Sequence, residues 1–210
     1  MKYFFEFIRC LKEELVKGLP GEEYQKRMMS ALRNEFGSST DRHPKKAGVL
    51  LLLYPFESQI FISFIKRTLS GYPHSGQISF PGGKHENSDE SLIGTAVRET
   101  YEEIGVEPED IHILGPLTSL FIPVSNFNVF PSVGYVLSRP AFDPNPAEVQ
   151  EIIEVSINKF IDPKYISAFN LQIGKRVFAV PCYSVENNKI WGATAMIMSE
   201  FAEIVNRTGL

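Results

Sequence analysis

The stretch GGKHENSDESLIGTAVRETYEEIGV, residues 82–106, decides the fold of this chain. A glycine pair opens it, and a helical pattern follows from about residue 89 to residue 104. Ile93, Val97, Thr100 and Ile104 recur at helical spacing and share one arc of the helix. We expect this arc to pack against the rest of the protein.

Both ends of this helix carry recognisable signals. Ser88 or Asp89 can cap the N-terminus, because a short polar side chain there accepts a hydrogen bond from the exposed backbone. Gly105 stands where a C-cap glycine belongs. The helix is the best-signalled element of the sequence.

A second arc of the same helix is acidic. Glu99, Glu102 and Glu103 fall within about 100° of one another. A solvated helix face is the ordinary explanation of such a run. However, like charges at i and i+4, as in Glu99 and Glu103, cost a helix about 0.2 to 0.5 kcal/mol. A hard divalent cation bound between the carboxylates offsets that cost, and magnesium prefers oxygen ligands beside phosphates.

Arg98 stands one turn before Glu102. At this i, i+4 spacing the guanidinium and the carboxylate can pair. We expect Arg98 to orient Glu102 from outside the metal's own ligand set.

Strand patterns lie on both sides of the helix. Upstream are GVLLLLYP and QIFISFIKR, separated by the breaker residues 55–58, and then ISF at 78–80. Downstream are IHILGPLTSL, FPSVGYVL, EIIEVSI, RVFAVPCYSV and KIWG, and the helical run ATAMIMSEFAEIV closes the pattern. Strands and helices in this order predict an α/β fold.

The N-terminal region has a different character. Phe4, Phe5, Ile8, Leu11 and Leu15 have helical spacing, and a second helical stretch runs from Glu22 to about Phe36. Residues 37–46 are polar and rich in turn formers. We therefore predict a helical extension and linker at residues 1–46 and the main domain at residues 47–210.

Composition restricts the class of protein. The 210 residues are 43% hydrophobic and 22% charged, with a net charge of -4 and a pI near 5.6. This balance disfavours nucleic acid and anionic membranes as partners. The chain has no apolar run of about 18 residues and no CxxC pair among its two cysteines, so we expect a cytoplasmic protein with free thiols. A homodimer is left open.

Rival catalytic motifs are incomplete. The sequence contains no HExxH pair, no GxSxG elbow and no P-loop with its lysine. Zinc peptidase, serine hydrolase and P-loop nucleotidase chemistry therefore lack support.

With these residues in place, Gly82 to Val106 resembles the Nudix box. Six positions of that pattern match: Gly83, Arg98, Glu99, Glu102, Glu103 and Gly105. Two positions depart from it, since Gly83 to Glu90 is one residue longer than usual and Thr100 replaces an aliphatic residue. Glu90 is then either a box carboxylate or an acid that favours the helix N-terminus.

The preceding segment, residues 65–83, is similar to the coenzyme A pyrophosphatase branch of that family. Arg67, Gly76, Gln77, Phe80 and Pro81 carry the likeness, and residues 121–131 and 190–195 add to it. The resemblance implies a Nudix-type α/β/α sandwich around a mixed β-sheet, here with an N-terminal helical extension.

The resemblance also implies roles for individual residues. Glu99, Glu102 and Glu103 would bind Mg²⁺ or Mn²⁺, and water would attack a phosphorus of the substrate. Candidates for the general base are Glu102 or Glu99 and, from the segment AEVQEIIEV, Glu148 or Glu151.

The substrate would meet a second set of residues. The Gly82-Gly83 turn permits close approach of backbone to phosphate, and Lys84 or Arg67 can contribute positive charge. These residues complete the predicted site.

Three functions follow from the resemblance. The first is hydrolysis of coenzyme A or its thioesters, giving adenosine 3',5'-bisphosphate and a phosphopantetheine product. The second is hydrolysis of another small nucleotide, ADP-ribose or a dinucleoside polyphosphate. The third is a catalytically weak module that binds a ligand, which the crowded carboxylates argue against.

Overall fold

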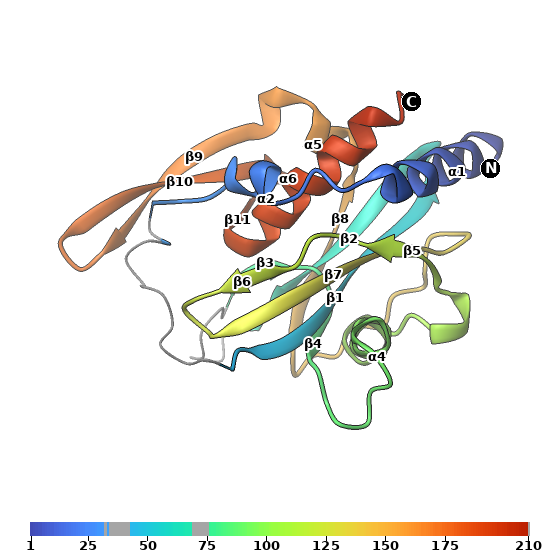
Figure 1. Ribbon diagram of the computed structural model, residues 1–210, viewed down its shortest axis with the longest axis horizontal. Helices are drawn as coiled ribbons and strands as arrows, with labels where there is room; N and C mark the ends of the chain where they lie inside the picture. The colour runs from blue at the N-terminus through green and yellow to red at the C-terminus, as the bar shows by residue number, and fades with distance from the viewer. Residues whose placement is uncertain (32, 34–42, 69–75, 210) are drawn as a thin grey trace.

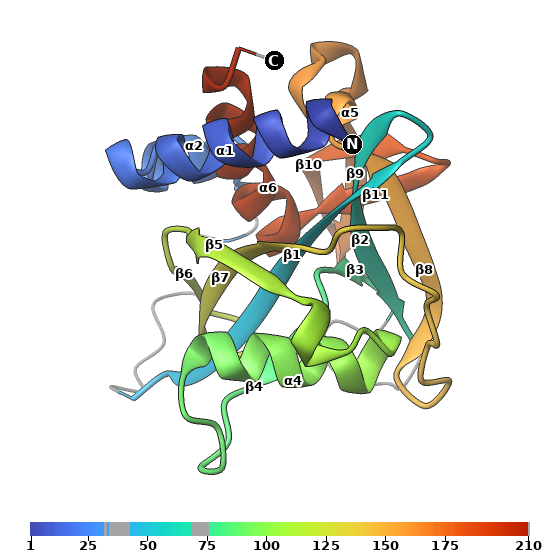
Figure 2. The same cartoon turned by 90° about the vertical axis from the view of Figure 1, so that its right-hand side faces the viewer.

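A mixed β-sheet lies between two helical layers (Figures 1 and 2). The structure is a computed structural model, and it describes residues 1–31, 33, 43–68 and 76–209. Helix α4 (Leu92–Ile104) covers one face of the sheet. Helices α1 (Lys2–Lys17) and α6 (Gly192–Arg207) cover the other. The predicted α/β/α sandwich with an N-terminal helix is confirmed.

The main sheet has eight strands, with the order β3-β2-β1-β7-β5 along its path, and β4, β6 and β8 pair beside β1, β7 and β2. Only the β1–β7 pair is parallel among the described pairings, so the sheet is mixed. The strands are β1 (Lys45–Phe56), β2 (Gln59–Arg67), β3 (Ile78–Ser79), β4 (Gly82–Lys84), β5 (His112–Pro116), β6 (Leu120–Ile122), β7 (Phe127–Tyr135) and β8 (Val149–Ser156).

A smaller sheet follows in the order β11-β10-β9. Its strands are β9 (Ile166–Ile173), β10 (Arg176–Val185) and β11 (Asn188–Trp191). The short helices η1 (Pro108–Asp110), α5 (Asn158–Ile161) and η2 (Pro163–Tyr165) join the elements. In Figure 1 the β9–β10 hairpin projects from the body of the molecule.

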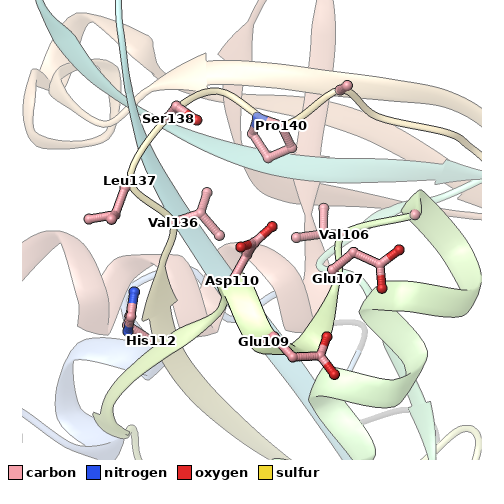
Figure 3. A pocket seen from close by; sticks show the side chains of 11 residues that line it. Val106, Glu107, Glu109, Asp110, His112, Val136, Leu137, Ser138 and Pro140 are labelled. Atoms are coloured by element: carbon pink, nitrogen blue, oxygen red, sulfur yellow. The ribbon is translucent and has the colours of Figure 1, made fainter.

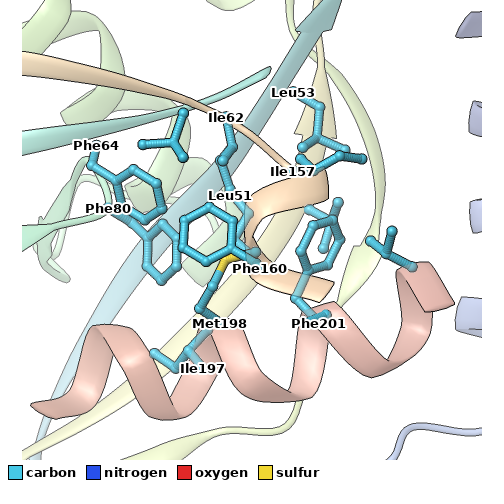
Figure 4. Close-up of a cluster of buried hydrophobic side chains, with 14 of the residues drawn as sticks. Leu51, Leu53, Ile62, Phe64, Phe80, Ile157, Phe160, Ile197, Met198 and Phe201 are labelled. Atoms are coloured by element: carbon cyan, nitrogen blue, oxygen red, sulfur yellow. The ribbon is translucent and has the colours of Figure 1, made fainter. Parts of the chain in front are cut away.

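Strand β1 is buried on both faces, which explains its unbroken run of leucines. Leu50 and Leu52 pack on the α4 side, and Leu51 and Leu53 pack on the α6 side. Figure 4 shows the hydrophobic cluster on the α6 side of the sheet, where Leu51 and Leu53 lie among aromatic side chains that include Phe201 of α6. Strand β1 is therefore the centre of the core.

Helix α4 approaches this strand closely at a glycine. A Cβ atom on Gly48 would lie 2.2 Å from the carbonyl oxygen of Leu92 and 3.0 Å from the backbone nitrogen of Ala96. No side chain fits between the helix and β1 at this point. The contact fixes the height of α4 above the sheet.

The N-terminal helix packs into the same core. Phe4, Phe7, Ile8 and Leu11 of α1 are buried. Phe5, which the spacing placed on the packing face, is exposed instead. The buried stripe runs through Phe4 and Phe7, and Phe5 is turned about 100° away from Phe4.

The second N-terminal helix is shorter than the sequence predicted. Helix α2 (Glu22–Lys26) ends ten residues before Phe36, and the chain turns so that Met28 enters the core. Residues 34–42, which include the predicted end of this helix and most of the linker, lie outside the described residues.

A buried carboxylate joins this segment to the rest of the chain. Glu200 of α6 is fully buried and accepts hydrogen bonds from the backbone N–H of Gly21 (3.2 Å), from Gln25 Nε2 (2.9 Å) and from Thr118 Oγ1 (2.6 Å). The α2 segment is thus hydrogen-bonded to α6, and α1 packs against α6. The domain boundary at residue 46 stays a prediction. Among the described residues no helix is long and apolar enough to cross a membrane.

Candidate active site

The acidic helix starts later than the sequence predicted. Ser91, and not Ser88 or Asp89, is the N-cap, since its Oγ accepts a hydrogen bond from the backbone N–H of Gly94 at 3.0 Å. Gly105 ends the helix with φ 69°, a left-handed conformation that favours glycine. The predicted C-cap is confirmed.

The packing face of α4 also differs from the prediction. Thr95, Ala96, Thr100 and Ile104 are buried, whereas Ile93 is exposed. Gly48 of β1 contacts the side of α4 that carries Leu92 and Ala96, so this side of the helix faces the sheet. Ile93 consequently points away from the sheet. Thr100 is accommodated in the core because its hydroxyl donates to the carbonyl oxygen of Ala96 at 2.7 Å.

Two of the predicted carboxylates lie against the glycine pair. The N–H of Gly82 donates to Glu103 Oε2 at 2.8 Å. A Cβ atom on Gly83 would lie 2.4 Å from the carboxyl carbon of Glu99. Gly82 has φ 148°, which few other residues adopt. The two glycines therefore admit both carboxylates next to the backbone of β4.

Glu103 is the most deeply placed of the glutamates, at 1% exposure. Burial raises the pKa of its carboxyl to about 8, although the Gly82 N–H and the nearby Arg67 act in the opposite direction. Arg67 Nη1 lies 3.3 Å from Glu103 Oε1. Burial also raises the pKa of Glu99. Burial thus disfavours the ionised form of both carboxyls, and a bound cation would offset this effect.

Arg98 connects the carboxylates on the outer side of the helix. Its Nη1 atom lies 2.8 Å from Glu102 Oε2 and 2.9 Å from Glu99 Oε1. Its Nε atom donates to Asp89 Oδ1 at 2.8 Å. The contact predicted between Arg98 and Glu102 is present, and Arg98 holds two further carboxylates that the prediction did not include.

Asp89 is the site residue that the sequence reasoning missed. Its Oδ2 accepts hydrogen bonds from Thr95 Oγ1 (2.8 Å) and from the N–H of Glu86 (2.9 Å), and the Arg98 guanidinium holds the pKa of its carboxyl well below the usual range. Glu90, the acid that the box spacing selects, is exposed. Because the segment after Gly83 is one residue longer than usual, Asp89 and not Glu90 pairs with Arg98. Two adjacent acids in the sequence, Asp89 and Glu90, could have indicated two candidates for this partner.

Glu148 approaches the site from the loop before β8. The side chain is exposed, and its negative charge contributes to the raised pKa of Glu99 and Glu103. The N–H of Asn145, in the same loop, donates to the backbone oxygen of Glu103 at 3.0 Å. This bond ties the loop to the end of α4.

Glu151 lies elsewhere. It pairs with Lys66 at 3.7 Å and shares its side of β8 with Ile153 and Val155, which pack in the α6 cluster. The side chain is therefore on the far side of the sheet from α4. Lys84 is exposed at the end of β4, and its backbone oxygen accepts a bond from Arg98 Nη2 at 3.3 Å.

The donors fit a hard divalent ion in their chemistry. Glu99, Glu102 and Glu103 offer carboxylate oxygens, which Mg²⁺ and Mn²⁺ prefer. In the part of the chain that the structure describes, no three His, Cys, Asp or Glu side chains stand ready as a ligand set. Glu102 is half-exposed at the surface end of the group and bonded to Arg98.

A separate cavity of about 370 Å³ lies beyond the end of α4 (Figure 3). Its lining includes Glu107, Glu109 and Asp110 and none of the three helix glutamates. An acidic lining repels phosphate. The cavity is not part of the candidate site.

Comparisons of the sequence and of the fold found similar proteins. The family described as NUDIX domain matches residues 44–178. A protein named uncharacterized Nudix hydrolase NudL, from Pectobacterium atrosepticum, is 33% identical over 129 residues, which are 61% of this chain and 67% of the relative. Nudix hydrolase 22, chloroplastic, from Arabidopsis thaliana is 32% identical over 169 residues, 77% of this chain and 56% of the relative. The matched region thus spans little more than half the length of the plant protein.

Solved structures share the fold at low identity. A Nudix hydrolase from M. smegmatis, RenU, has a TM-score of 0.56 at 14% identity, covering 78% of this chain and 87% of that chain. A MutT/nudix family protein from Enterococcus faecalis has a TM-score of 0.51 at 18% identity, covering 88% of this chain and 73% of that one. At this identity the likeness concerns the fold alone.

Proposed function

Because the chain belongs to the Nudix hydrolase family, we propose that it hydrolyses a diphosphate bond in a nucleoside diphosphate-linked substrate, with Mg²⁺ or Mn²⁺. The observation that carries the proposal is the position of Glu99 and Glu103 against the Gly82-Gly83 backbone. Because neither glycine has a side chain, both carboxylates stand directly beside this backbone, where they can hold a metal.

Glu99, Glu102 and Glu103 would hold the ion. When bound, the ion neutralises phosphate oxygens and acidifies a water molecule. Arg98 keeps Glu99 and Glu102 on one side of the helix, and Asp89 fixes Arg98 in turn. Both are positioning residues.

A general base is also required. The candidates are Glu99, Glu102 and Glu148. Glu148 is close enough that its negative charge raises the pKa of both Glu99 and Glu103. The place of Glu151 on the other face of the sheet argues against it.

For the substrate we propose coenzyme A or its thioesters. The support is the sequence likeness of residues 65–83 to the coenzyme A pyrophosphatase branch, together with the position of Arg67 beside Glu103. Arg67 and Lys84 would meet substrate phosphates. An arginine matches phosphate oxygens with two parallel donors.

A metal-dependent activity panel tests the proposal. Coenzyme A, dephospho-coenzyme A, ADP-ribose and diadenosine polyphosphates are compared with Mg²⁺ and Mn²⁺. Glu102→Gln should lower turnover by at least ~10²-fold, consistent with the loss of several kcal/mol of transition-state stabilisation. Glu107→Gln, an exposed acid outside the site, is the control. Higher activity on ADP-ribose or on a dinucleoside polyphosphate would replace coenzyme A as the substrate, and metal-dependent binding without turnover of any compound would favour a ligand-binding module.

Arg67→Ala then addresses the phosphate contact. We expect a loss of roughly 10- to 100-fold on coenzyme A. A contact with the 3'-phosphate predicts a selective loss on coenzyme A, whereas a contact with the diphosphate predicts an equal loss on dephospho-coenzyme A. Lys66→Ala, which changes the neighbouring cation on the other side of β2, is the control. Unchanged activity of Arg67→Ala on both substrates would exclude Arg67 from the site.

A further inference from the structure

Strand β9 forms the edge of the small sheet. It is 8 residues long, and within the described residues only β10 pairs with it. The hairpin that it forms with β10 extends away from the helices (Figure 1). An edge strand of this length presents unpaired backbone groups that can accept another strand.

The sequence of this edge lacks the usual protection. Strand β9 reads ISAFNLQI and contains neither a charged residue nor proline. The other edge strands among the described residues differ from β9: β8 contains Glu151 and Glu154, the five-residue β5 ends in Pro116, and β3 and β6 have only 2 and 3 residues. Charges and prolines are the means by which proteins prevent strands from pairing at an edge.

Apolar side chains are exposed at the same place. Ile166 is 47% exposed, Ile173 is 43% exposed, and Val177 of β10 is 60% exposed. Beyond its pairing with β11 the hairpin is only two-stranded, and a two-stranded arrangement is marginally stable by itself in water. A further strand along β9 would cover part of this surface.

The pairing with β10 shows which backbone groups are free. Ala168 stands opposite Pro181, which has no N–H to donate. This pair is therefore of the non-hydrogen-bonded kind, and the N–H and C=O groups of Ala168 point away from β10. By alternation, Ile166, Asn170 and Gln172 point the same way.

We propose that β9 pairs with the β9 of a second copy of this chain. Antiparallel pairing about a two-fold axis at Phe169 places the outward groups of Ala168 opposite those of Asn170 of the second copy. The result is one continuous six-stranded sheet. Because β9 is uncharged, its self-pairing opposes no like charges.

The assembly closes at two copies. At the other edge of the sheet, β11 has only 4 residues, and helix α6 begins directly after it. A further chain cannot continue the ladder there. The isologous contact therefore gives a dimer and no filament.

Charge substitutions at Asn170 test the proposal on the full chain. Sedimentation across a dilution series should show a species of about twice the 23.7 kDa chain mass. Asn170→Lys and Asn170→Glu each place like charges near the axis and should weaken dimerisation roughly tenfold. Mixing the two variants should restore a dimer, because opposite charges then face each other.

Gln150→Lys makes the same kind of change on the exposed edge of β8, where we expect no effect on the mass. The proposal is overturned if the wild-type chain remains a monomer throughout the series, or if Asn170→Lys and Gln150→Lys have the same effect. Damage to the hairpin is recognised because the mixture of Asn170→Lys and Asn170→Glu would then stay monomeric, which also overturns the proposal.

Discussion

Arg98 and Asp89 form the best-defined pair of side chains at the candidate site. The carboxylate of Asp89 accepts from Nε and Nη2 of Arg98 at 2.8 and 3.1 Å, while Nη1 faces Glu99 and Glu102. The fork of the guanidinium allows one residue to hold all of these groups. Lysine has a single ammonium and cannot do so.

Asp89→Asn should therefore reduce turnover, by roughly 10- to 100-fold, because a hydrogen bond to a charged group contributes about 1.5 to 3 kcal/mol. Glu90→Gln changes the exposed neighbouring acid and should have no comparable effect. Turnover and Mn²⁺ affinity are measured together, since a positioning role also predicts weaker metal binding. If Glu90→Gln were the more damaging change, Asp89 would lose its assigned role.

A second prediction concerns pH and rests on Glu103, whose pKa burial raises to about 8. Below that pH a cation must displace the proton, so Mn²⁺ affinity should rise as pH rises from about 6 to 8, by up to about tenfold per unit. Titration calorimetry in two buffers of different ionisation enthalpy measures the proton released. Equal affinity at pH 6 and pH 8 would contradict a protonated Glu103.

The stability of the metal-free chain should change in the opposite direction. The pKa of Glu103 in the folded state exceeds its ordinary value of 4.5, so the folded state binds more protons between these values. The free energy of unfolding should then fall as pH rises from about 4.5 to about 8. Glu103→Gln should remove this dependence.

At the scale of single elements, α4 shows what the sequence could and could not predict. Gly105 and the glutamate spacing located its end and its acidic residues, because caps and helical periodicity are local properties. The predicted packing face of α4 was wrong at Ile93, because the orientation of the helix depends on its close approach to Gly48, in a strand far away in the sequence. Asp89 was missed for another reason: its contact with Arg98 depends on the path of the loop that precedes α4, which helical periodicity does not describe.

Strand β9 was missed for a different reason. Phe169, Leu171 and Ile173 do alternate with the polar residues Asn170 and Gln172, but this alternating run is only five residues long and Ile166 is out of phase with it. The strand forms because β10 offers a continuous partner across eight residue pairs. Such pairing is invisible to a local pattern.

Gly48→Ala should test the contact between α4 and β1. The added Cβ would meet backbone atoms at 2.2 and 3.0 Å, so we expect a loss of about 1 to 3 kcal/mol in urea unfolding. Gly94→Ala is the matched change within α4, where the nearest atom is Ser91 Oγ at 3.4 Å. Helix propensity predicts a gain of up to about 1 kcal/mol there. Equal effects of the two changes would refute the close contact.

At the scale of the whole molecule, Glu200 links segments that are far apart in the sequence. It accepts bonds from Gly21 and Gln25 near one end of the chain and from Thr118 in the middle. Glu200→Ala removes the acceptor that these donors share at a buried position, although Gln25 Nε2 keeps its bond to the Thr118 carbonyl oxygen, and should lower the free energy of unfolding by about 3 kcal/mol. Glu203→Ala, which breaks an exposed pair with Arg207 on the same helix, should cost below about 1 kcal/mol. Similar costs for both would show that Glu200 has no special role.

The shared core of α1 and α6 also affects how the chain is made. One hydrophobic cluster includes residues from both ends of the chain, from Phe4 in α1 to Val205 in α6. Strand β1 also pairs in parallel with β7, about 80 residues later in the sequence. Contacts so distant in sequence form slowly, because a long loop must close before they contribute. On the ribosome, the apolar face of α1 can therefore be covered completely only after α6 has been synthesised. We expect the nascent chain to be prone to aggregation until then.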